Sequence, residues 1–326
     1  MPPRHQADVP GLVERARAGE ARAVARLISL VEDESPLLRE VTAALAPHTG
    51  RAQVLGLTGA PGVGKSTTTN ALVRELRSAG KRVGVLAVDP SSPFSGGALL
   101  GDRIRMQDHA GDKDVYIRSM ASRGHLGGLA WSTPQAVRVL DAAGCDVVVV
   151  ETVGVGQSEV EVAGLADTTL VLLAPGMGDG IQAAKAGILE VGDVYVVNKA
   201  DRDGADQVRR DLRSMVALAD RPDDGWAPPI VKTVAQAGEG LAELVAEVER
   251  HHAWLQQTGE LGARRTRRAR AEVEAIALAA LRRSWGDLGG SDGQAGLDEL
   301  AAAVAAGETD PWAAADRLLE QVGART

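Results

Sequence analysis

Cysteine, aromatic residues and long apolar runs are scarce in this chain of 326 residues, and each shortage limits the kinds of core, site or location that the protein can have. The single cysteine, Cys145, allows no disulfide within the chain and no cysteine-based metal site, so we expect a small apolar residue beside a buried strand. Aromatic residues make up only 2% of the chain, so we expect a core of Val, Leu, Ile and Ala. No apolar run approaches the ~20 residues that span a bilayer, and residues 1–10 hold no apolar signal core. These absences predict a protein of the reducing cytoplasm with no membrane partner.

Positive charge is also in short supply, because 44 acidic residues outnumber 36 Lys and Arg residues and the net charge is −8. This balance argues against nucleic acid as the main partner. One basic stretch, at residues 264–270, departs from it, and we interpret this stretch as a solvated helix face or a contact with a partner. Lysine is rare in comparison with arginine in this chain, so the presence of a lysine indicates a site that needs a compact ammonium group. Lys65, Lys185 and Lys199 are of interest for this reason.

Short Val-rich runs alternate with helical patterns between residues 51 and 250, which is typical of an α/β protein. Near-continuous apolar runs suit strands that are buried on both faces, so we predict a mostly parallel sheet covered by helices. The expected strands are 53–58, 82–88, 115–118, 146–150, 168–173, 194–197 and 229–232.

Helical patterns alone occupy the two ends of the chain. We expect residues 9–47 to be helical throughout, with punctuation at Pro36 and Pro47. The C-terminal helices either pack back on the core or form a dimerisation arm, and their pattern does not choose between the two. They are expected at 239–258, 264–286, 293–306 and 310–322. The predicted parts are a helical extension (1–50), a central α/β domain (51–258) and a helical arm (259–326).

Residues 59–66, GAPGVGKS, form a complete G-x-x-x-x-G-K-[ST] phosphate loop between the expected strand 53–58 and a helical pattern. The glycines let successive backbone N–H groups surround a phosphate chain, where a Cβ atom would intrude. Lys65 would reach the outer phosphates, Ser66 would ligate Mg²⁺, and the helix N-terminus adds a favourable dipole. The chain is therefore predicted to bind a nucleoside triphosphate. The predicted contacts are Gly59, Ala60, Pro61, Gly62, Val63, Gly64, Lys65, Ser66 and Thr67.

An N-K-x-D element, formed by Asn198, Lys199 and Asp201, directly follows the expected strand 194–197. A carboxylate at Asp201 can accept hydrogen bonds from N1–H and the exocyclic amine of guanine, and adenine presents a different pattern. Lys199 can lie across the base, and Asn198 can tie this turn to the phosphate loop. The expected nucleotide is therefore GTP rather than ATP. Candidates for supporting backbone contacts to the base are Thr233 and Ala235.

Three carboxylates are candidates for the metal shell and for the hydrolytic step. Glu151 follows the strand 146–150, where switch GTPases have Asp-x-x-Gly, and Gly154 can offer its N–H group to the γ-phosphate. Asp89 follows the strand 82–88, and Asp102 lies beyond it in a glycine-rich segment with the length of a switch. The ordinary alternatives are a capping or surface acid for Glu151 and turn or N-cap residues for the two aspartates.

A further glycine-rich segment begins at Pro175, after the strand 168–173. Asp179, Gln182 and Lys185 would share one helical face in this segment, so it is a candidate switch. A cation that reaches the γ-phosphate neutralises charge in the transition state, and Lys185 could play this role. A solvated helix lysine is the alternative.

Four longer runs resemble those of the MeaB/ArgK GTPases, the methylmalonyl-CoA mutase-associated proteins. They are DPSSPFSGGALLGDRIRM (89–106), SRGHLGGLA (122–130), ETVGVGQSEVEVA (151–163) and NKAD (198–201). The resemblance implies a SIMIBI-class P-loop fold in a cytoplasmic homodimer that pairs through the C-terminal arm. It also implies that the GTP or GDP state gates cobalamin loading, protection or repair of an adenosylcobalamin-dependent methylmalonyl-CoA mutase.

The same resemblance assigns roles to residues. It maps Asp89, Asp102 and Glu151 to the carboxylates of the Mg²⁺ site and the switches. It maps residues 176–188 to a switch that rearranges when the mutase binds and brings Lys185 towards the nucleotide. The expected enzyme is a Mg²⁺-dependent GTPase that is slow alone and is accelerated by its partner.

Two other functions are compatible with a phosphate loop. A small-molecule kinase, linked to arginine or ornithine transport, is an older idea for this family; it needs an acceptor pocket and a base, and the N-K-x-D element disfavours ATP. A nickel-delivery GTPase needs metal-binding residues, and one Cys with six scattered His residues gives it little support.

Overall fold

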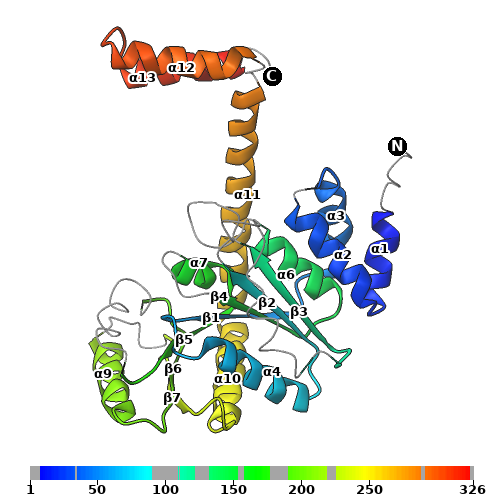
Figure 1. Ribbon diagram of the computed structural model, residues 1–326, viewed down its shortest axis with the longest axis vertical. Coiled ribbons are helices and arrows are strands. Elements are labelled where there is room, and N and C mark those ends of the chain that lie inside the picture. Colours follow the sequence, from blue (N-terminus) through cyan, green and yellow to red (C-terminus); the bar gives the residue numbers. More distant parts are fainter. Residues whose placement is uncertain are drawn as a thin grey trace. The chain divides into compact units, whose positions relative to one another are not determined.

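A parallel sheet of seven strands, in the order β3-β2-β4-β1-β5-β6-β7, organises the described part of the chain (Figure 1). Every strand pair runs parallel, so all the strands end at the same edge of the sheet. The predicted α/β class and the mostly parallel sheet are therefore confirmed. The strands are β1 (Gln53–Thr58), β2 (Val83–Asp89), β3 (Val115–Ala121), β4 (Val147–Thr152), β5 (Thr168–Leu173), β6 (Val194–Asn198) and β7 (Ile230–Thr233).

The computed structural model describes most of the chain, which divides into two compact units. The larger unit is Met1–Gly262 and the smaller unit is Ala263–Thr326. No helix in the described ranges is both long enough and apolar enough to cross a membrane. The described residues are 8–33, 35–89, 109, 111–121, 132–152, 158–176, 190–218, 225–287 and 291–323.

Both faces of the sheet are covered by helices, which explains the apolar runs of its central strands. All six residues of β4 are buried. Val148 and Val150 join the core that contains α6 (Thr133–Ala142) and α7 (Ser158–Leu165). Val147 and Val149, which alternate with them, join the core that contains α4 (Lys65–Ser78) and α10 (Leu241–Thr258). Alternate side chains of one strand thus serve two different cores. A smaller core lies under α9 (Ala205–Leu218).

The N-terminal region forms three helices, and the expectation of continuous helix over 9–47 is wrong at one place. The helices are α1 (Val9–Arg17), α2 (Ala21–Glu32) and α3 (Leu38–Leu45), followed by a 3-10 turn, η1 (Ala46–His48). The missed break falls at Gly19, whose φ of 86° is left-handed and ends the first helix. Leu27 and Ile28 of α2 share a core with Leu86 of β2, so these helices pack on the sheet.

One C-terminal helix, α11, begins four residues earlier than the predicted start at residue 264. The helix α11 spans Glu260–Asp287 and starts directly after Gly259, which ends α10 with a φ of 77°. A single left-handed glycine is enough to end one helix, and the next can begin without a loop, which is why the expected gap up to residue 264 is absent. The remaining helices are α12 (Ser291–Ala305) and α13 (Pro311–Gly323).

Candidate functional site

The predicted site elements follow the carboxyl ends of several strands and therefore lie at one edge of the sheet. The phosphate loop follows β1, Glu151 lies near the end of β4, and Asn198 ends β6. Glu151 pairs in register with Leu57 of β1 and with Ala87 of β2. This is the edge at which parallel α/β sheets bind their ligands.

The phosphate loop needs glycine at two positions because other parts of the site approach its backbone. Gly59 has a φ of 141°, and a Cβ atom there would lie 2.3 Å from the carbonyl oxygen of Leu172. Gly64 has a φ of 97°, and its Cβ atom would lie 2.4 Å from Nδ2 of Asn198. Any side chain at either position would be strained and would also clash. The loop is therefore shaped by β5 and by the last residue of β6.

Lys65 begins α4 and folds back over the phosphate loop. Its ammonium group donates to the carbonyl oxygens of Gly59, at 2.5 Å, and Ala60, at 3.1 Å. The side chain is buried, with 7% of its surface exposed. A buried ammonium with carbonyl partners stays within the curl of the loop, where it can meet an anion. Thr67, two residues further along the helix, is exposed.

Glu151 is a buried acid and not a surface or capping residue. Only 4% of its surface is exposed, and its Oε1 accepts a hydrogen bond of 2.6 Å from the hydroxyl of Ser66. Its Oε2 accepts a second one of 2.8 Å from the hydroxyl of Thr69. Sequence reasoning missed Thr69. A hydroxyl three residues beyond Ser66 on the same helix is the signal that could have found it, because such residues share a face.

The donor atoms around Glu151 suit Mg²⁺. The Ser66 hydroxyl and the Glu151 carboxylate both present oxygen, which is the ligand that this ion prefers. No group of three or more His, Cys, Asp and Glu side chains in the described ranges could hold a metal ion. Mg²⁺ usually takes only one or two carboxylates beside phosphates and water, so a hydroxyl and one carboxylate next to the phosphate loop fit it.

Asn198 joins three segments of the site, and it makes the contact to the phosphate loop that the sequence predicts. Its Nδ2 donates to the carbonyl oxygen of Val63 at 2.8 Å. Its Oδ1 accepts from the hydroxyl of Thr233 at 3.1 Å and from the backbone N–H of Ala235 at 3.2 Å. Thr233 and Ala235 thus hold the Asn198 side chain in place, and the N–H of Ala235 is used in a hydrogen bond to Asn198. Only 3% of Asn198 is exposed.

Lys199 and Asp201 follow Asn198 closely in the chain. Lys199 has a φ of 57°, the one positive value among the described non-glycine residues. Its ammonium group donates to the carbonyl oxygen of Gly62 at 2.6 Å, so the guanine element and the phosphate loop are joined a second time. Asp201 is exposed. A left-handed residue other than glycine is strained, and such strain is common in binding sites.

Several predicted site residues lie wholly or partly outside the described part of the chain. Asp89 ends β2 and pairs with Ala121 of β3, but its side chain lies outside the described part of the chain. The other predicted switch and catalytic residues also lie outside the described residues; they are Asp102, Gly154, Asp179, Gln182 and Lys185.

Cys145 lies before β4, at the edge of the sheet that is remote from the phosphate loop. It is 3% exposed, which confirms the expectation of a small buried residue. Burial raises the pKa of its thiol to about 12. A neutral buried thiol neither binds metal nor attacks a substrate, so Cys145 is structural.

Comparisons with known proteins agree with this geometry. A family model for the methylmalonyl Co-A mutase-associated GTPase MeaB matches residues 24–285. A putative GTPase of Pyrococcus abyssi is 45% identical over 313 residues, which cover 95% of this chain and 96% of that protein. The mouse methylmalonic aciduria type A homolog, a mitochondrial protein, is 37% identical over 272 residues, which cover 78% of this chain and 65% of that protein.

A solved structure extends the agreement to three dimensions. The crystal structure of an LAO/AO transport system kinase superimposes with a TM-score of 0.73 and 28% identity, and 98% of each chain is covered. The predicted SIMIBI-class P-loop fold, guanine-nucleotide binding and GTP hydrolysis are thereby confirmed. The chain belongs to the MeaB family of methylmalonyl-CoA mutase-associated GTPases.

Proposed function

We propose that this GTPase is a metallochaperone whose nucleotide state gates cobalamin loading, protection or reactivation of an adenosylcobalamin-dependent methylmalonyl-CoA mutase. The observation that carries the proposal is the match of residues 24–285 to a family described by its association with that mutase. The name of the mouse relative, a methylmalonic aciduria type A homolog, points to the same metabolism.

The described residues favour tight binding of GTP over rapid turnover. The phosphate loop and the Lys65 ammonium would hold the phosphates, while Lys199 and Asp201 would hold the base. The phosphate-binding part and the base-binding part of the site are joined by the hydrogen bond from Asn198 to Val63 and by the one from Lys199 to Gly62. Interactions that bind substrate and transition state equally do not raise the turnover rate. A site with such preformed ground-state contacts suits a switch.

We further propose that the site uses Mg²⁺, held by Ser66 with Glu151, Asp89 and Asp102. The ion would neutralise charge on the β- and γ-phosphates and so favour breaking the bond between them. Glu151 orients the hydroxyls of Ser66 and Thr69 from its buried position. Without those hydrogen bonds the Ser66 oxygen would lose its fixed direction. Glu151→Gln should therefore weaken Mg²⁺-dependent GTP binding more than Mg²⁺-independent GDP binding.

Hydrolysis requires that water attack the γ-phosphorus while the bond to the β-phosphate breaks. We assign this step to residues beyond the described part: Asp102 and Gly154, and the switch of Asp179, Gln182 and Lys185. In the proposal, the mutase rearranges this switch and brings the Lys185 ammonium to the γ-phosphate. Phosphoryl transfer depends mainly on positioning and charge stabilisation, so the partner would accelerate it without supplying new chemistry.

GTP turnover by the purified protein, with and without methylmalonyl-CoA mutase, tests the proposal. Stimulation and co-elution are expected for the unaltered chain. Lys185→Ala should retain nucleotide binding and lose the stimulation, while Lys113→Ala, a change at an exposed lysine, should keep both. Unchanged turnover together with no co-elution would overturn the mutase assignment. Full stimulation of Lys185→Ala would remove that lysine from the mechanism.

The C-terminal unit carries apolar side chains that suit the proposed homodimer. Val273 is 67% exposed and Trp312 is 83% exposed. Ile276, Leu278 and Leu281 of α11 are also exposed. Burial of such side chains against a second copy would stabilise a dimer. Replacement of Val273 and Ile276 by Asp should shift the mass measured by light scattering from dimer to monomer. A dimer that survives this double change would place the interface elsewhere.

A small-molecule kinase is the second candidate, and a specific observation favours it. The superimposable crystal structure is that of a protein named as an LAO/AO transport system kinase. Transfer of labelled γ-phosphate to arginine or ornithine, instead of to water, would establish this activity. Release of all the label as inorganic phosphate would exclude those acceptors.

A further inference from the structure

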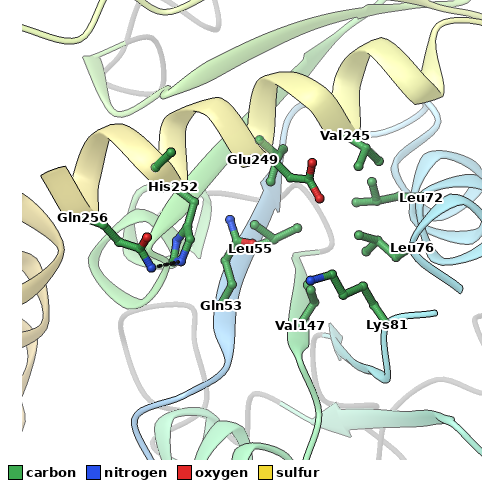
Figure 2. Close-up of a pocket in the computed structure, with 12 residues that line it drawn as sticks. Gln53, Leu55, Leu72, Leu76, Lys81, Val147, Val245, Glu249, His252 and Gln256 are labelled. Carbon is green, nitrogen blue, oxygen red and sulfur yellow. Dashed lines mark hydrogen bonds between the residues drawn. The ribbon is translucent and has the colours of Figure 1, made fainter. Parts of the chain in front are cut away.

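A cavity of about 140 Å³ lies between α4, α10 and the sheet, and no step of GTP binding or hydrolysis uses it (Figure 2). We call it the α4–α10 cavity. Gln53 and Val147, the first residues of β1 and β4, line it. The phosphate loop and Glu151 lie at the other ends of these strands. A strand of six residues is about 20 Å long, so a molecule in this cavity cannot touch the nucleotide.

The floor of the α4–α10 cavity is aliphatic. Leu55 comes from β1, Leu72 and Leu76 come from α4, and Val248 comes from α10. All four side chains are buried, with at most 4% of their surface exposed. An engineered cavity of about 150 Å³ with a similar lining takes up benzene, so this space can accept an alkyl group of about three to five carbons.

Polar groups surround the mouth of the cavity, and their charges have opposite signs. Lys81 and Glu249 both line it, and Figure 2 shows their charged ends directed into the same region. Neither side chain makes a hydrogen bond or an ion pair with another described residue. Nε2 of Gln53 is buried and also has no hydrogen-bond partner among the described residues. A buried amide without a partner is costly, and a bound ligand can supply the missing acceptor.

We propose that the α4–α10 cavity binds a small aliphatic α-amino acid, of the size of valine. Its alkyl group would lie on the leucine and valine floor. Its carboxylate would accept hydrogen bonds from the Lys81 ammonium and the Gln53 amide, and its ammonium group would donate to Glu249. A zwitterion joined to a short branched chain matches all three features, whereas a purely apolar ligand would leave the charged mouth unused.

Methyl-selective NMR of the full chain, titrated with L-valine, tests the proposal. Saturable shifts are expected for methyl groups of Leu55, Leu72 and Val248. Two analogues that keep the isopropyl group of valine separate the charges: isovalerate lacks the ammonium group and isobutylamine lacks the carboxylate. Each should bind about tenfold more weakly. This factor corresponds to the lower end of the free energy of a hydrogen bond to a charged group, because the mouth of the cavity is partly solvated. Equal binding of all three probes would overturn the proposed recognition.

Substitutions locate the binding site and distinguish a loss of binding from a loss of folding. Lys81→Gln and Glu249→Gln should each weaken L-valine binding about tenfold, while Lys113→Gln should leave it unchanged. Ala253→Leu places extra carbon atoms in the cavity and should abolish binding. All four variants should hydrolyse GTP at the basal rate, which shows that they are folded. Undiminished binding of L-valine to Lys81→Gln or to Ala253→Leu would refute the site, as would shifts confined to other methyl groups.

Discussion

Asn198→Ala is the substitution whose effect the structure determines most closely. Asn198 is buried and makes three hydrogen bonds, with the carbonyl of Val63, the hydroxyl of Thr233 and the N–H of Ala235. Alanine at this position therefore leaves three polar groups of the site without these partners. The effect should therefore appear in folding as well as in nucleotide binding.

The magnitude follows from those three contacts. A buried hydrogen bond contributes about 1 kcal/mol net, so three of them give a loss of about 3 kcal/mol in the free energy of unfolding. In a domain of this size, 1 kcal/mol corresponds to about 2–4 °C in Tm, so we expect a decrease of at least about 6 °C. Binding of GDP should weaken as well, because Asn198 holds the guanine element against the phosphate loop.

Scanning calorimetry of the nucleotide-free protein measures the first effect, and titration with GDP measures the second. Gln207→Ala is the matched control, since it removes an amide of the same kind whose hydrogen bond to Asp211 lies on the exposed surface of α9. The control should change the free energy of unfolding by less than about 0.5 kcal/mol. A Tm of Asn198→Ala within 2 °C of that control would refute the reasoning, because three buried hydrogen bonds would then contribute almost nothing.

Gly59→Ala should abolish GDP binding in a titration, because its Cβ atom would lie 2.3 Å from a carbonyl oxygen of β5, while Gly111→Ala, where the space is open, should bind normally. Iodoacetamide should leave Cys145 unlabelled in the folded protein up to pH 9 and label it in denaturant, since burial raises the pKa of the thiol to about 12; rapid labelling of the folded chain would contradict this. The hydrogen bond from Arg77 holds the pKa of Asp112 below 3.8, so its stabilisation is present above that pH and is lost as the pH falls below it. Arg77→Met should therefore reduce the acid dependence of the urea midpoint below pH 3.8, and an unchanged dependence would exclude the pair as its cause.

The sequence was sufficient for most of the sheet because a strand buried on both faces is apolar along its whole length. β1 and β5 have the predicted bounds, at 53–58 and 168–173. β3 was predicted to end at residue 118 but continues to Ala121. It lies at the edge of the sheet, where the polar residues Arg118 and Ser119 still pair with β2. Hydrogen bonding there extends beyond the apolar run, and an apolar pattern cannot detect it.

The site was predicted where a motif fixes the residue types, and it was missed where the fold alone brings residues together. The contact from Asn198 to the phosphate loop follows from two motifs that lie at one sheet edge. Thr69 belongs to no motif, and its hydrogen bond to Glu151 depends on the packing of α4 beside β4. The engagement of Ala235 by Asn198 likewise depends on where β7 lies next to β6.

The N-terminal helices have a consequence for how the chain folds. Arg118 of β3 donates hydrogen bonds to Ser29 and Glu32 of α2, and the hydroxyl of Tyr116 donates to the carbonyl of Gly19. These links, together with the shared apolar core, join the three N-terminal helices to the sheet. A chain begun near residue 50 would leave that core open to water. The helices and the sheet should therefore unfold in a single cooperative transition, and the GTP site gains its stability partly from the core that these helices complete.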